Sequence, residues 1–210
     1  MNKKRCVIVG GAEIKDIDYI KTLIKPDDFV VYCDSGLRHM ESLGAEADLI
    51  VGDFDSHENP KSSVETIVLP REKDDTDTFF AAKEAVRRGF DDFLLLGVIG
   101  GRLDHTLANV SILLWLESIG KSALVADDHS SIRVISAGTT KVDAGCEYFS
   151  LLNITGDAKG VTIKNAKFPL ENAEIPCEYQ FAVSNEPIGG SQPEISLGRG
   201  RLLLVEVRHG

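Results

Sequence analysis

Long hydrophobic runs are missing from this 210-residue sequence. No apolar stretch approaches the roughly 20 residues that a helix needs to cross a bilayer. The first apolar run, residues 6–9, is too short for a signal-peptide core because Gly10 and Gly11 follow it at once. We therefore expect a cytoplasmic protein that has no membrane partner.

Cysteine is scarce, and its four copies lie far apart at Cys6, Cys33, Cys146 and Cys177. They form no C-x-x-C pair, and the histidines do not cluster. Zinc sites in proteins normally need such closely spaced ligands. The spacing therefore argues against zinc and predicts buried, reduced thiols.

Positive charge is also in short supply, with 23 Lys and Arg against 33 Asp and Glu and a net charge of −10. An acidic surface argues against a nucleic-acid backbone or an anionic membrane as the main partner. An acidic protein that acts on phosphates usually needs a divalent cation between the two. The charge balance therefore raises the possibility of such a cation.

Familiar nucleotide-binding motifs are absent. The sequence has no G-x-x-x-x-G-K-[ST], which excludes a P-loop enzyme, and Gly10-Gly11-Ala12 is not a complete G-x-G-x-x-G. Asp53-Phe54-Asp55 is similar to the D-x-D-x-[TV] motif of aspartyl-phosphate phosphatases. His57 stands in place of Thr or Val, however, and that motif would follow the first strand of its fold, which weakens this interpretation.

Apolar runs and helical patterns alternate over residues 1–128. The runs predict strands buried on both faces at 6–9, 29–33, 49–51, 67–69, 93–97 and 123–126. Helical spacing is clearest at 76–88 and 106–118. In the second of these, Leu107, Val110, Leu114 and Trp115 form the expected buried stripe. The alternation predicts an α/β domain, a mostly parallel Rossmann-like sheet flanked by helices.

Helical periodicity ends near Asp128, and residues 129–210 read as strands with glycine and proline breaks. The predicted strands are 132–135, 148–154, 160–163, 179–183, 194–197 and 201–207. We therefore predict a second domain, an antiparallel β-sandwich, that begins at residue 129.

Polar clusters, four of the five with glycine, follow most strands of the first domain. They are Gly10-Gly11, Asp34-Ser35-Gly36, Gly52–Ser56, Lys73–Asp77 and Gly100–His105. Ligands of open α/β sheets bind beyond the carboxyl ends of the strands. Five such clusters at one edge therefore predict a binding site there.

The pair Asp53 and Asp55 is the sharpest single feature. Two carboxylates two residues apart in a tight turn can direct oxygens at one point, which suits a hard cation such as magnesium. Alternatively, one aspartate makes an Asx turn and the other faces solvent. Because the pattern is short, the pair alone does not decide between these interpretations.

The segment Lys73–Asp77 adds three carboxylates, Asp74, Asp75 and Asp77, just before a helical pattern. Helix capping can account for one of them. It does not account for all three, because packed like charges repel unless a cation lies nearby. A metal site that combines Asp77 with Asp53 and Asp55 is the more economical interpretation.

The Gly100–His105 cluster offers two glycines, Gly100 and Gly101, for close backbone approach. Arg102 can fork onto phosphate oxygens. Asp104 is either a ligand contact or the cap of the following helix, and His105 is either a contact or a surface imidazole. Asn109 lies one helical turn beyond His105 and is expected to point the same way.

Taken in order, these motifs resemble the thiamine pyrophosphokinase family. The resemblance rests on Asp34-Ser35-Gly36, Gly52–Ser56, Asp74–Asp77 and Gly100–His105, and extends to Val183-Ser184-Asn185 and Gly200–Val207. It covers about residues 6–207. Each motif is moderately specific alone, and their order and spacing together are highly specific.

The resemblance implies that residues 1–128 bind ATP and magnesium and that residues 129–210 bind thiamine. Asp53, Asp55 and Asp77 would hold the metal, and the same cleft would be lined by Asp34, Ser35, Asp74, Gly100, Gly101, Arg102, Asp104, His105 and Asn109. Ser184 and Asn185 would help to hold thiamine from the partner chain of a homodimer, whose active sites would lie between subunits.

The implied reaction is attack of thiamine's hydroxyl on the β-phosphorus of ATP, which gives thiamine diphosphate and AMP. Asp74 and Asp77 are both candidates to accept the hydroxyl proton. One rival is a pyrophosphokinase that acts on another hydroxyalkyl heterocycle such as a pterin. The other is a non-catalytic sensor of thiamine diphosphate or a nucleotide.

Overall fold

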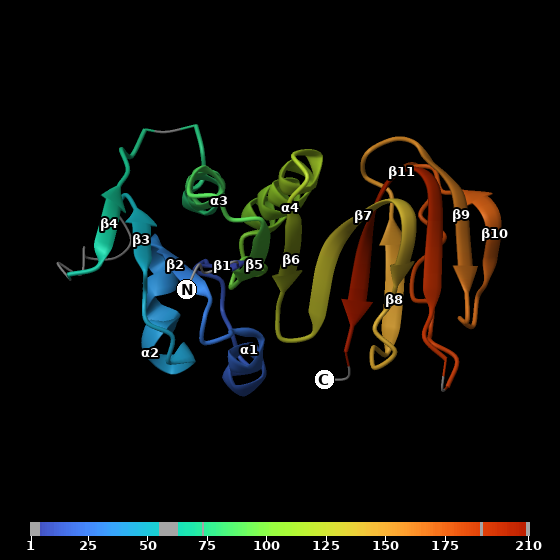
Figure 1. Cartoon of the computed structure of the whole chain (residues 1–210), viewed down its shortest axis with the longest axis horizontal. Helices are drawn as coiled ribbons and strands as arrows, with labels where there is room; N and C mark the ends of the chain where they lie inside the picture. The colour runs from blue at the N-terminus through green and yellow to red at the C-terminus, as the bar shows by residue number, and fades with distance from the viewer. Residues whose placement is uncertain (1–4, 55–62, 73, 190, 209–210) are drawn as a thin grey trace. The chain divides into compact units, whose positions relative to one another are not determined.

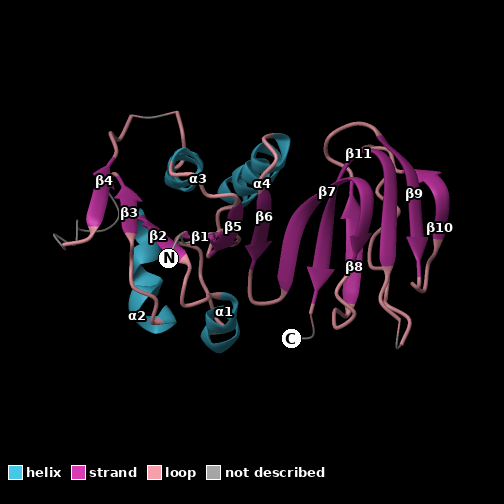
Figure 2. Cartoon of the chain, in the orientation of Figure 1, coloured by secondary structure: helices cyan, strands magenta, loops and turns pink. Residues whose placement is uncertain are grey.

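The computed structural model describes residues 5–54, 63–72, 74–189 and 191–208. The chain divides into two compact units, Met1–Asp128 and His129–Gly210. The first combines strands and helices, and the described part of the second contains strands (Figures 1 and 2). Each unit is described by itself.

The first unit is built on a parallel sheet. Its strands are β1 (Arg5–Val9), β2 (Phe29–Cys33), β3 (Leu49–Gly52), β4 (Glu65–Val68), β5 (Asp92–Leu96) and β6 (Ser122–Ala126). Their spatial order is β4-β3-β2-β1-β5-β6. In the register of the sheet, Cys6 of β1 is paired with Phe29 on one side and Phe93 on the other. The inner strands are continuous apolar runs because both of their faces are covered.

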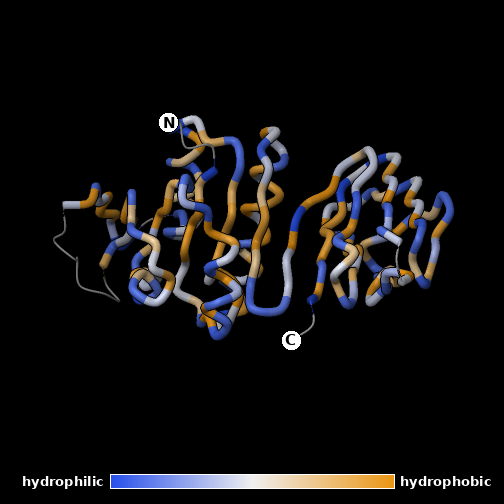
Figure 3. Tube along the Cα trace, turned by 60° about the horizontal axis from the view of Figure 1, so that its bottom comes forward, coloured by the Kyte–Doolittle hydropathy of each residue, from blue (hydrophilic) through white to orange (hydrophobic). Residues whose placement is uncertain are grey.

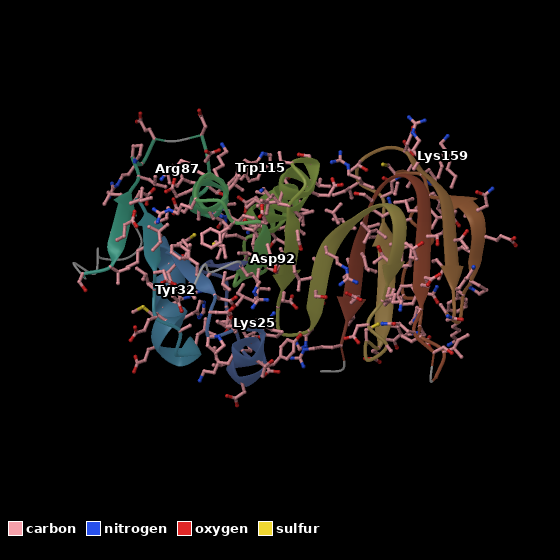
Figure 4. All side chains as sticks on the ribbon, viewed as in Figure 1. Lys25, Tyr32, Arg87, Asp92, Trp115 and Lys159 are labelled. Carbon is pink, nitrogen blue, oxygen red and sulfur yellow. The ribbon has the colours of Figure 1, made fainter. Side chains whose placement is uncertain are left out.

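Helices cover both faces of this sheet (Figure 1). The helices α1 (Ile17–Leu23) and α2 (Met40–Leu43) lie on one face, and α3 (Asp77–Arg87) and α4 (Leu103–Ser118) lie on the other. Tyr32 belongs to the apolar cluster beneath α1 and α2. Trp115 of α4, labelled in Figure 4, packs edge-to-face on Phe79 of α3, with 5.2 Å between the ring centroids. The hydrophobic strands and hydrophilic connections are visible along the chain in Figure 3.

Two details of the first unit differ from the sequence-based predictions. The strand near residue 67 is an edge strand and is not buried on both faces, since Val68 is 61 % exposed. Leu107 is exposed as well, and the buried stripe of α4 consists of Asn109, Ile112, Leu113 and Leu116. Apolar residues surround most of this helix, so their spacing alone does not select the buried face.

The second unit is antiparallel. Its strands are β7 (Ser130–Lys141), β8 (Tyr148–Leu152), β9 (Ala158–Lys164), β10 (Leu170–Glu174) and β11 (Glu194–Val207). The long strand β11 pairs with β7 along one edge, and β9 and then β8 share its other edge. Inward-facing side chains such as Phe149, Val161 and Leu204 form a single apolar cluster. The predicted fold class, a parallel α/β region followed by antiparallel strands, is therefore confirmed.

Three strand predictions in the second unit need correction. The strands predicted at 194–197 and 201–207 form one continuous strand whose register shifts between Leu197 and Arg201. Gly200 makes this possible, because it has a φ of 97° and a Cβ there would lie 1.6 Å from the carbonyl oxygen of Asp157. Residues 179–183 are not a regular strand, whereas β10 is one although it was not predicted.

Among the described residues, no helix is both long and apolar enough to span a bilayer.

Candidate active site

A cavity of about 690 Å³ opens at the carboxyl edge of the parallel sheet. The cavity lies beside β1, where the strand order changes direction. The chain runs from β1 through β2 and β3 to β4 on one side, and β5 and β6 lie on the other side of β1. Loops diverge at such a switch point and leave a crevice for ligands. The loops after β1 and β5 form its floor, since Gly10 N–H donates to Leu96 O and Ala12 N–H donates to Gly97 O, both at 2.8 Å.

Glycines allow these loops to pack closely. A Cβ on Gly10 would lie 2.7 Å from the carbonyl oxygen of Gly97, and a Cβ on Gly36 would lie 2.2 Å from that of Val9. Contacts this short do not occur for real side chains. The loops after β1, β2 and β5 therefore form one tightly packed base for the cavity.

Most of the sequence-predicted site residues of the first unit meet at this cavity. Those that line it are Asp34, Ser35, Asp53, Asp77, Gly100, Gly101, Arg102, His105 and Asn109. Asp74 and Asp104 are exposed and are not among the lining residues. Asp55 and the neighbouring Ser56 lie outside the described residues.

Three of the lining carboxylates form a cluster. Asp34, Asp53 and Asp77 each offer an oxygen, and these oxygens lie within 4.8 Å of one another. Asp34 is buried and adopts a left-handed backbone conformation, with φ 28°, that is uncommon for a residue with a side chain. Gly52 makes room for it, because a Cβ on Gly52 would lie 2.9 Å from the Cβ of Asp34. The end of β3 thus brings Asp53 close to the end of β2.

Helix capping leaves Asp77 available to this cluster. Thr76 is the N-cap of α3, and its hydroxyl oxygen accepts the N–H of Phe79 at 3.2 Å. Asp75 forms an ion pair with Lys83 at 2.8 Å. Asp74 and Asp75 precede the helix, Asp77 is its first residue, and Asp77 alone among the three lines the cavity.

The donor set of the cluster fits a divalent cation. Carboxylate oxygens are the ligands that hard cations such as Mg²⁺ prefer. Three carboxylates this close, one of them buried, repel one another strongly unless positive charge lies between them. The sequence-based trio was Asp53, Asp55 and Asp77, and the structure adds Asp34, which the sequence had indicated only as a cleft residue.

The Gly100–Asp104 turn forms another wall. The guanidinium of Arg102 donates to both carboxylate oxygens of Asp104, at 2.9 and 2.6 Å. This contact lowers the pKa of Asp104 and raises that of Arg102. Arg102 occupies the N-cap position of α4, and Asp104 lies within the first turn. The alternative in which Asp104 caps the helix is therefore wrong.

Asn109 secures this wall from inside. It is buried, and its side-chain amide donates to Val98 O at 2.8 Å. The Thr106 hydroxyl accepts the N–H of Gly100 at 3.2 Å. Both contacts tie α4 to the loop after β5, so they fix the glycine turn against the helix.

Several cavity residues were not predicted, among them Glu13, Arg38 and Thr78. Arg38 lies in the 3₁₀ helix η1 (Asp34–His39), and its guanidinium donates to Gly11 O. The neighbouring His39 is buried with Nε2 2.8 Å from Ala12 O, and burial lowers its pKa. A short 3₁₀ helix has no apolar periodicity. The only sequence signal for Arg38 as a cavity residue is therefore its position four residues after Asp34.

Ser184 and Asn185 lie in the second unit. Ser184 is exposed, has φ 55°, and its N–H donates to the Ser150 hydroxyl at 3.0 Å. Asn185 is buried, and its side-chain amide bonds to the backbone of Phe168 and Glu186.

Comparison with known proteins bears on both units. Residues 20–124 match the family described as "Thiamin pyrophosphokinase, catalytic domain", and residues 139–202 match "Thiamin pyrophosphokinase, vitamin B1 binding domain". The chain belongs to the thiamine pyrophosphokinase family. The two matches fall in the two structural units, and the first includes Asp34, Asp53 and Asp77.

Individual thiamine pyrophosphokinases agree with this family assignment. A curated relative named "Thiamine pyrophosphokinase" from Bacillus subtilis (strain 168) is 27 % identical over 184 residues, which cover 84 % of this chain and 82 % of the relative. The crystal structure of thiamin pyrophosphokinase from Geobacillus thermodenitrificans has a TM-score of 0.84 at 27 % identity and covers 98 % of both chains. The crystal structure of the Bacillus subtilis protein has a TM-score of 0.88 at 24 % identity, covers 99 % of this chain and 100 % of that one, and shows the shared fold.

Proposed function

We propose that this chain is an ATP:thiamine diphosphotransferase that transfers the pyrophosphoryl group of ATP to the hydroxyethyl oxygen of thiamine. The products are thiamine diphosphate and AMP. The observation that carries the proposal is the cluster of Asp34, Asp53 and Asp77 in a glycine-lined cavity of a thiamine pyrophosphokinase fold. That cluster supplies what phosphoryl chemistry needs, namely a means of holding positive charge beside phosphate oxygens.

The proposed metal is Mg²⁺, held by Asp34, Asp53 and Asp77, with Asp55 retained as a predicted ligand beside them. When bound, Mg²⁺ neutralises charge on the phosphate oxygens and orients the triphosphate. The protein's own contribution is to hold its carboxylates at a fixed separation. The close packing of Gly36 and Gly52 against neighbouring backbone supports that role.

In the proposed reaction, the thiamine hydroxyl oxygen attacks the β-phosphorus of ATP. A new P–O bond forms as the bond between the β-phosphorus and the α,β-bridging oxygen breaks, and AMP leaves with that oxygen. The proton of the hydroxyl passes to solvent or to Asp77, which lines the cavity, whereas Asp74 does not. The catalytic effect comes mainly from positioning and electrostatic stabilisation.

Cationic and backbone groups of the cavity are proposed to hold the phosphates. Arg102 is exposed, and a phosphate can replace Asp104 in its salt bridge, because two phosphate oxygens can accept the same pair of hydrogen bonds from the guanidinium. Arg38 of η1 provides a second guanidinium in the cavity lining, and Gly100 and Gly101 allow close backbone approach. His105 and Asn109 complete this side of the cavity, and Asp104 keeps Arg102 oriented between turnovers.

We also propose a cytoplasmic homodimer in which the Ser184 region of one protomer serves the cavity of its partner. Four free cysteines support a reducing compartment. Light scattering tests the assembly. Mixing the inactive Asp53→Asn variant with a Ser184→Ala variant tests site sharing, because subunit exchange would restore sites that contain neither substitution. Unchanged activity after mixing, despite demonstrated exchange, would contradict shared sites.

Release of AMP tests the reaction. The protein is incubated with ATP and Mg²⁺, and with thiamine, a hydroxymethyl pterin or no acceptor. AMP release only with thiamine supports the proposal, and formation of thiamine diphosphate by chromatography completes the mass balance. AMP release with the pterin supports the first rival activity. Binding of thiamine diphosphate without AMP release from either acceptor supports the sensor.

A further inference from the structure

His39 is a buried imidazole beside the cavity of the first unit. It is the last residue of η1, and 7 % of its surface is exposed. The cavity is lined by its neighbour Arg38 and not by His39 itself. Burial of a polar ring is unfavourable unless the ring forms hydrogen bonds. Any effect of His39 on the reaction therefore passes through the groups that its ring contacts.

One hydrogen bond determines the protonation of the ring. Nε2 lies 2.8 Å from the carbonyl oxygen of Ala12, which is 27 positions earlier in the chain. A carbonyl oxygen only accepts hydrogen bonds, so Nε2 carries a proton and donates it. Arg38 Nε lies 3.4 Å from the same nitrogen. A ring nitrogen that carries a proton has no free lone pair, so this longer contact is not a second hydrogen bond.

The bond from His39 reaches the loop after β1, here called the β1 loop (residues 10–16). Residues 10–13 of this loop line the cavity. Its N–H groups at Gly10 and Ala12 donate to the end of β5, and its carbonyls at Gly11 and Ala12 accept from Arg38 and His39. The β1 loop is therefore held from two sides, by β5 through its donors and by η1 through its acceptors.

The same bond fixes η1. This element is only six residues long, and the hydrogen-bond geometry of a 3₁₀ helix is poorer than that of an α-helix. Contacts with neighbouring segments must therefore contribute to its position. Asp34 begins η1 directly after β2, and His39 ends it. The strand fixes the first end, and the bond to Ala12 fixes the second. Arg38 lies next to this second end.

Arg38 and His39 differ in their response to a nucleotide. In the proposed function the guanidinium of Arg38 binds a phosphate, and a guanidinium that turns toward a phosphate can give up its hydrogen bond to Gly11. The imidazole of His39 lies outside the cavity lining and binds no phosphate. Its bond to Ala12 can therefore join η1 to the β1 loop both before and after ATP binds.

We propose that His39 is a positioning residue for nucleotide binding, because its Nε2–H bond to Ala12 holds η1 against the β1 loop and so keeps Arg38 directed into the cavity. This inference rests on the proposed function. It assigns a role to a residue that does not touch the substrates, and it makes the affinity for ATP, and not that for thiamine, depend on His39.

The test compares His39→Gln, His39→Asn and His39→Leu. The side-chain nitrogen of Gln is as many bonds from Cα as Nε2 of His, whereas that of Asn matches Nδ1. Only Gln can therefore donate from the position of Nε2 to Ala12. Titration calorimetry in the presence of Mg²⁺ measures Kd for an ATP analogue with a methylene bridge between the α- and β-phosphorus, which cannot release AMP.

We expect His39→Leu and His39→Asn to weaken binding of the analogue by about 5- to 10-fold, the scale on which residues outside a site change its affinity. His39→Gln should restore Kd to within about twofold of the wild type, since it replaces the donor. KM for thiamine should stay unchanged in all three variants. If His39→Leu does not fold, the comparison of Gln with Asn still decides the question.

Tyr32→Phe is the matched control. Tyr32, labelled in Figure 4, is also a buried side chain of the first unit that donates to a carbonyl, that of Ala45 at 2.8 Å. Ala45 precedes β3 and does not line this cavity. The substitution should lower the melting temperature and leave Kd for the analogue unchanged. Equal weakening in Tyr32→Phe and His39→Asn would mean that general loss of stability, and not positioning, explains the effect.

The two proposals fail in different ways. Wild-type protein that releases no AMP with thiamine refutes the proposed function, whatever the variants do. The role of His39 is refuted alone if the wild type is active and all three variants bind the analogue as the wild type does. It is also refuted if His39→Gln and His39→Asn lose affinity equally, because the bond from Nε2 would then not matter.

Discussion

The two units hold their candidate functional residues by different means. In the first, Asp34, Asp53 and Asp77 stand directly at strand or helix ends, and glycines let those ends pack against one another. In the second, an irregular segment carries Ser184, and side-chain amides such as that of Asn185 hold the segment to its surroundings. Topology thus determines position in the first unit, and individual hydrogen bonds determine it in the second.

This difference predicts different responses to substitution. Side chains at the parallel sheet edge can be replaced without loss of the fold, because backbone packing positions them. Where a buried amide does the positioning, its loss changes both the local structure and the stability, because backbone donors or acceptors lose their partner. The four predictions that follow test this contrast.

The largest effect is expected at the carboxylate cluster. Asp53→Asn and Asp77→Asn each remove one negative charge from the proposed metal site, so we expect kcat to fall by about 100-fold or more. The melting temperature should change little, because strand and helix ends position both residues. AMP release and circular dichroism measure the two quantities.

Asp75→Asn is the matched control for this prediction. Asp75 is two residues from Asp77 but pairs with Lys83 outside the cavity. Its substitution should leave kcat within about twofold, since an exposed ion pair contributes little. Equal loss of activity in Asp75→Asn and Asp77→Asn would refute the assignment of the cluster.

The glycine packing gives the next largest effect. Gly36→Ala places a Cβ 2.2 Å from the carbonyl oxygen of Val9. Backbone must shift to relieve this contact, and overpacking of this kind costs about 1–3 kcal/mol. We expect thermal unfolding to occur several degrees lower and the activity to fall, because Asp34 lies two residues away.

Gly101→Ala is the control for Gly36→Ala, because it makes the same substitution at a glycine that is not tightly packed. Gly101 also lines the cavity, but a Cβ there meets nothing within 4 Å. Its melting temperature should match the wild type. Similar destabilisation of both variants would show that tight loop packing is not what holds the first unit's site together.

The same contrast explains how far the sequence predicts the structure. Inner strands such as β2 follow from continuous apolar runs, and their parallel order places the polar clusters at one edge. The aspartates of the first unit could therefore be recognised before the structure was known. Arg38 could not be recognised in this way, because its 3₁₀ helix has no periodic pattern. The buried face of α4 could not be predicted either, because apolar residues surround most of that helix.

In the second unit the sequence was less informative. Strand β10 has little apolar alternation, and residues 179–183 have the composition of a strand but do not form a regular one. The side chain of Asn185 bonds to the backbone of Phe168, and nothing in the local pattern connects them. Positions set by long-range side-chain hydrogen bonds become visible only in the structure.

Asn153 tests the amide-based positioning of the second unit. Its Nδ2 donates to Gly156 O and Ile175 O, both at 2.6 Å, and the side chain is 1 % exposed. Asn153→Ala leaves the carbonyl of the buried Ile175 without this donor, so we expect the free energy of unfolding to fall by about 1–3 kcal/mol. Urea denaturation measures the change. A loss below about 0.5 kcal/mol, the range of ordinary surface substitutions, would contradict the importance of such amides.

The smallest effect is expected for an ion-pair network in the first unit. Glu84 of α3 accepts hydrogen bonds from Arg87 and Arg88, at 2.6–2.8 Å, and Arg88 also binds Glu65 of β4. These contacts, with Arg87 first, lower the pKa of Glu84 to about 2. Glu84→Gln should therefore cost about 1 kcal/mol at pH 7.

The stabilisation by Glu84 is expected to decrease at low pH. The unfolded carboxyl has a pKa of about 4.3, so the stabilisation is complete above that pH. It is lost as the pH falls toward about 2, where native Glu84 becomes protonated. The stability gap between wild type and Glu84→Gln should therefore be constant from pH 7 to 5 and shrink at pH 3.5.

Asp91→Asn is the control: it removes an exposed ion pair with Lys121 and should show no stability gap at any pH. If the difference in stability between wild type and Glu84→Gln stayed constant down to pH 3, then packing of the Glu84 side chain, and not its charge, would stabilise the contact between α3 and β4. Packing would then position this part of the first unit as well.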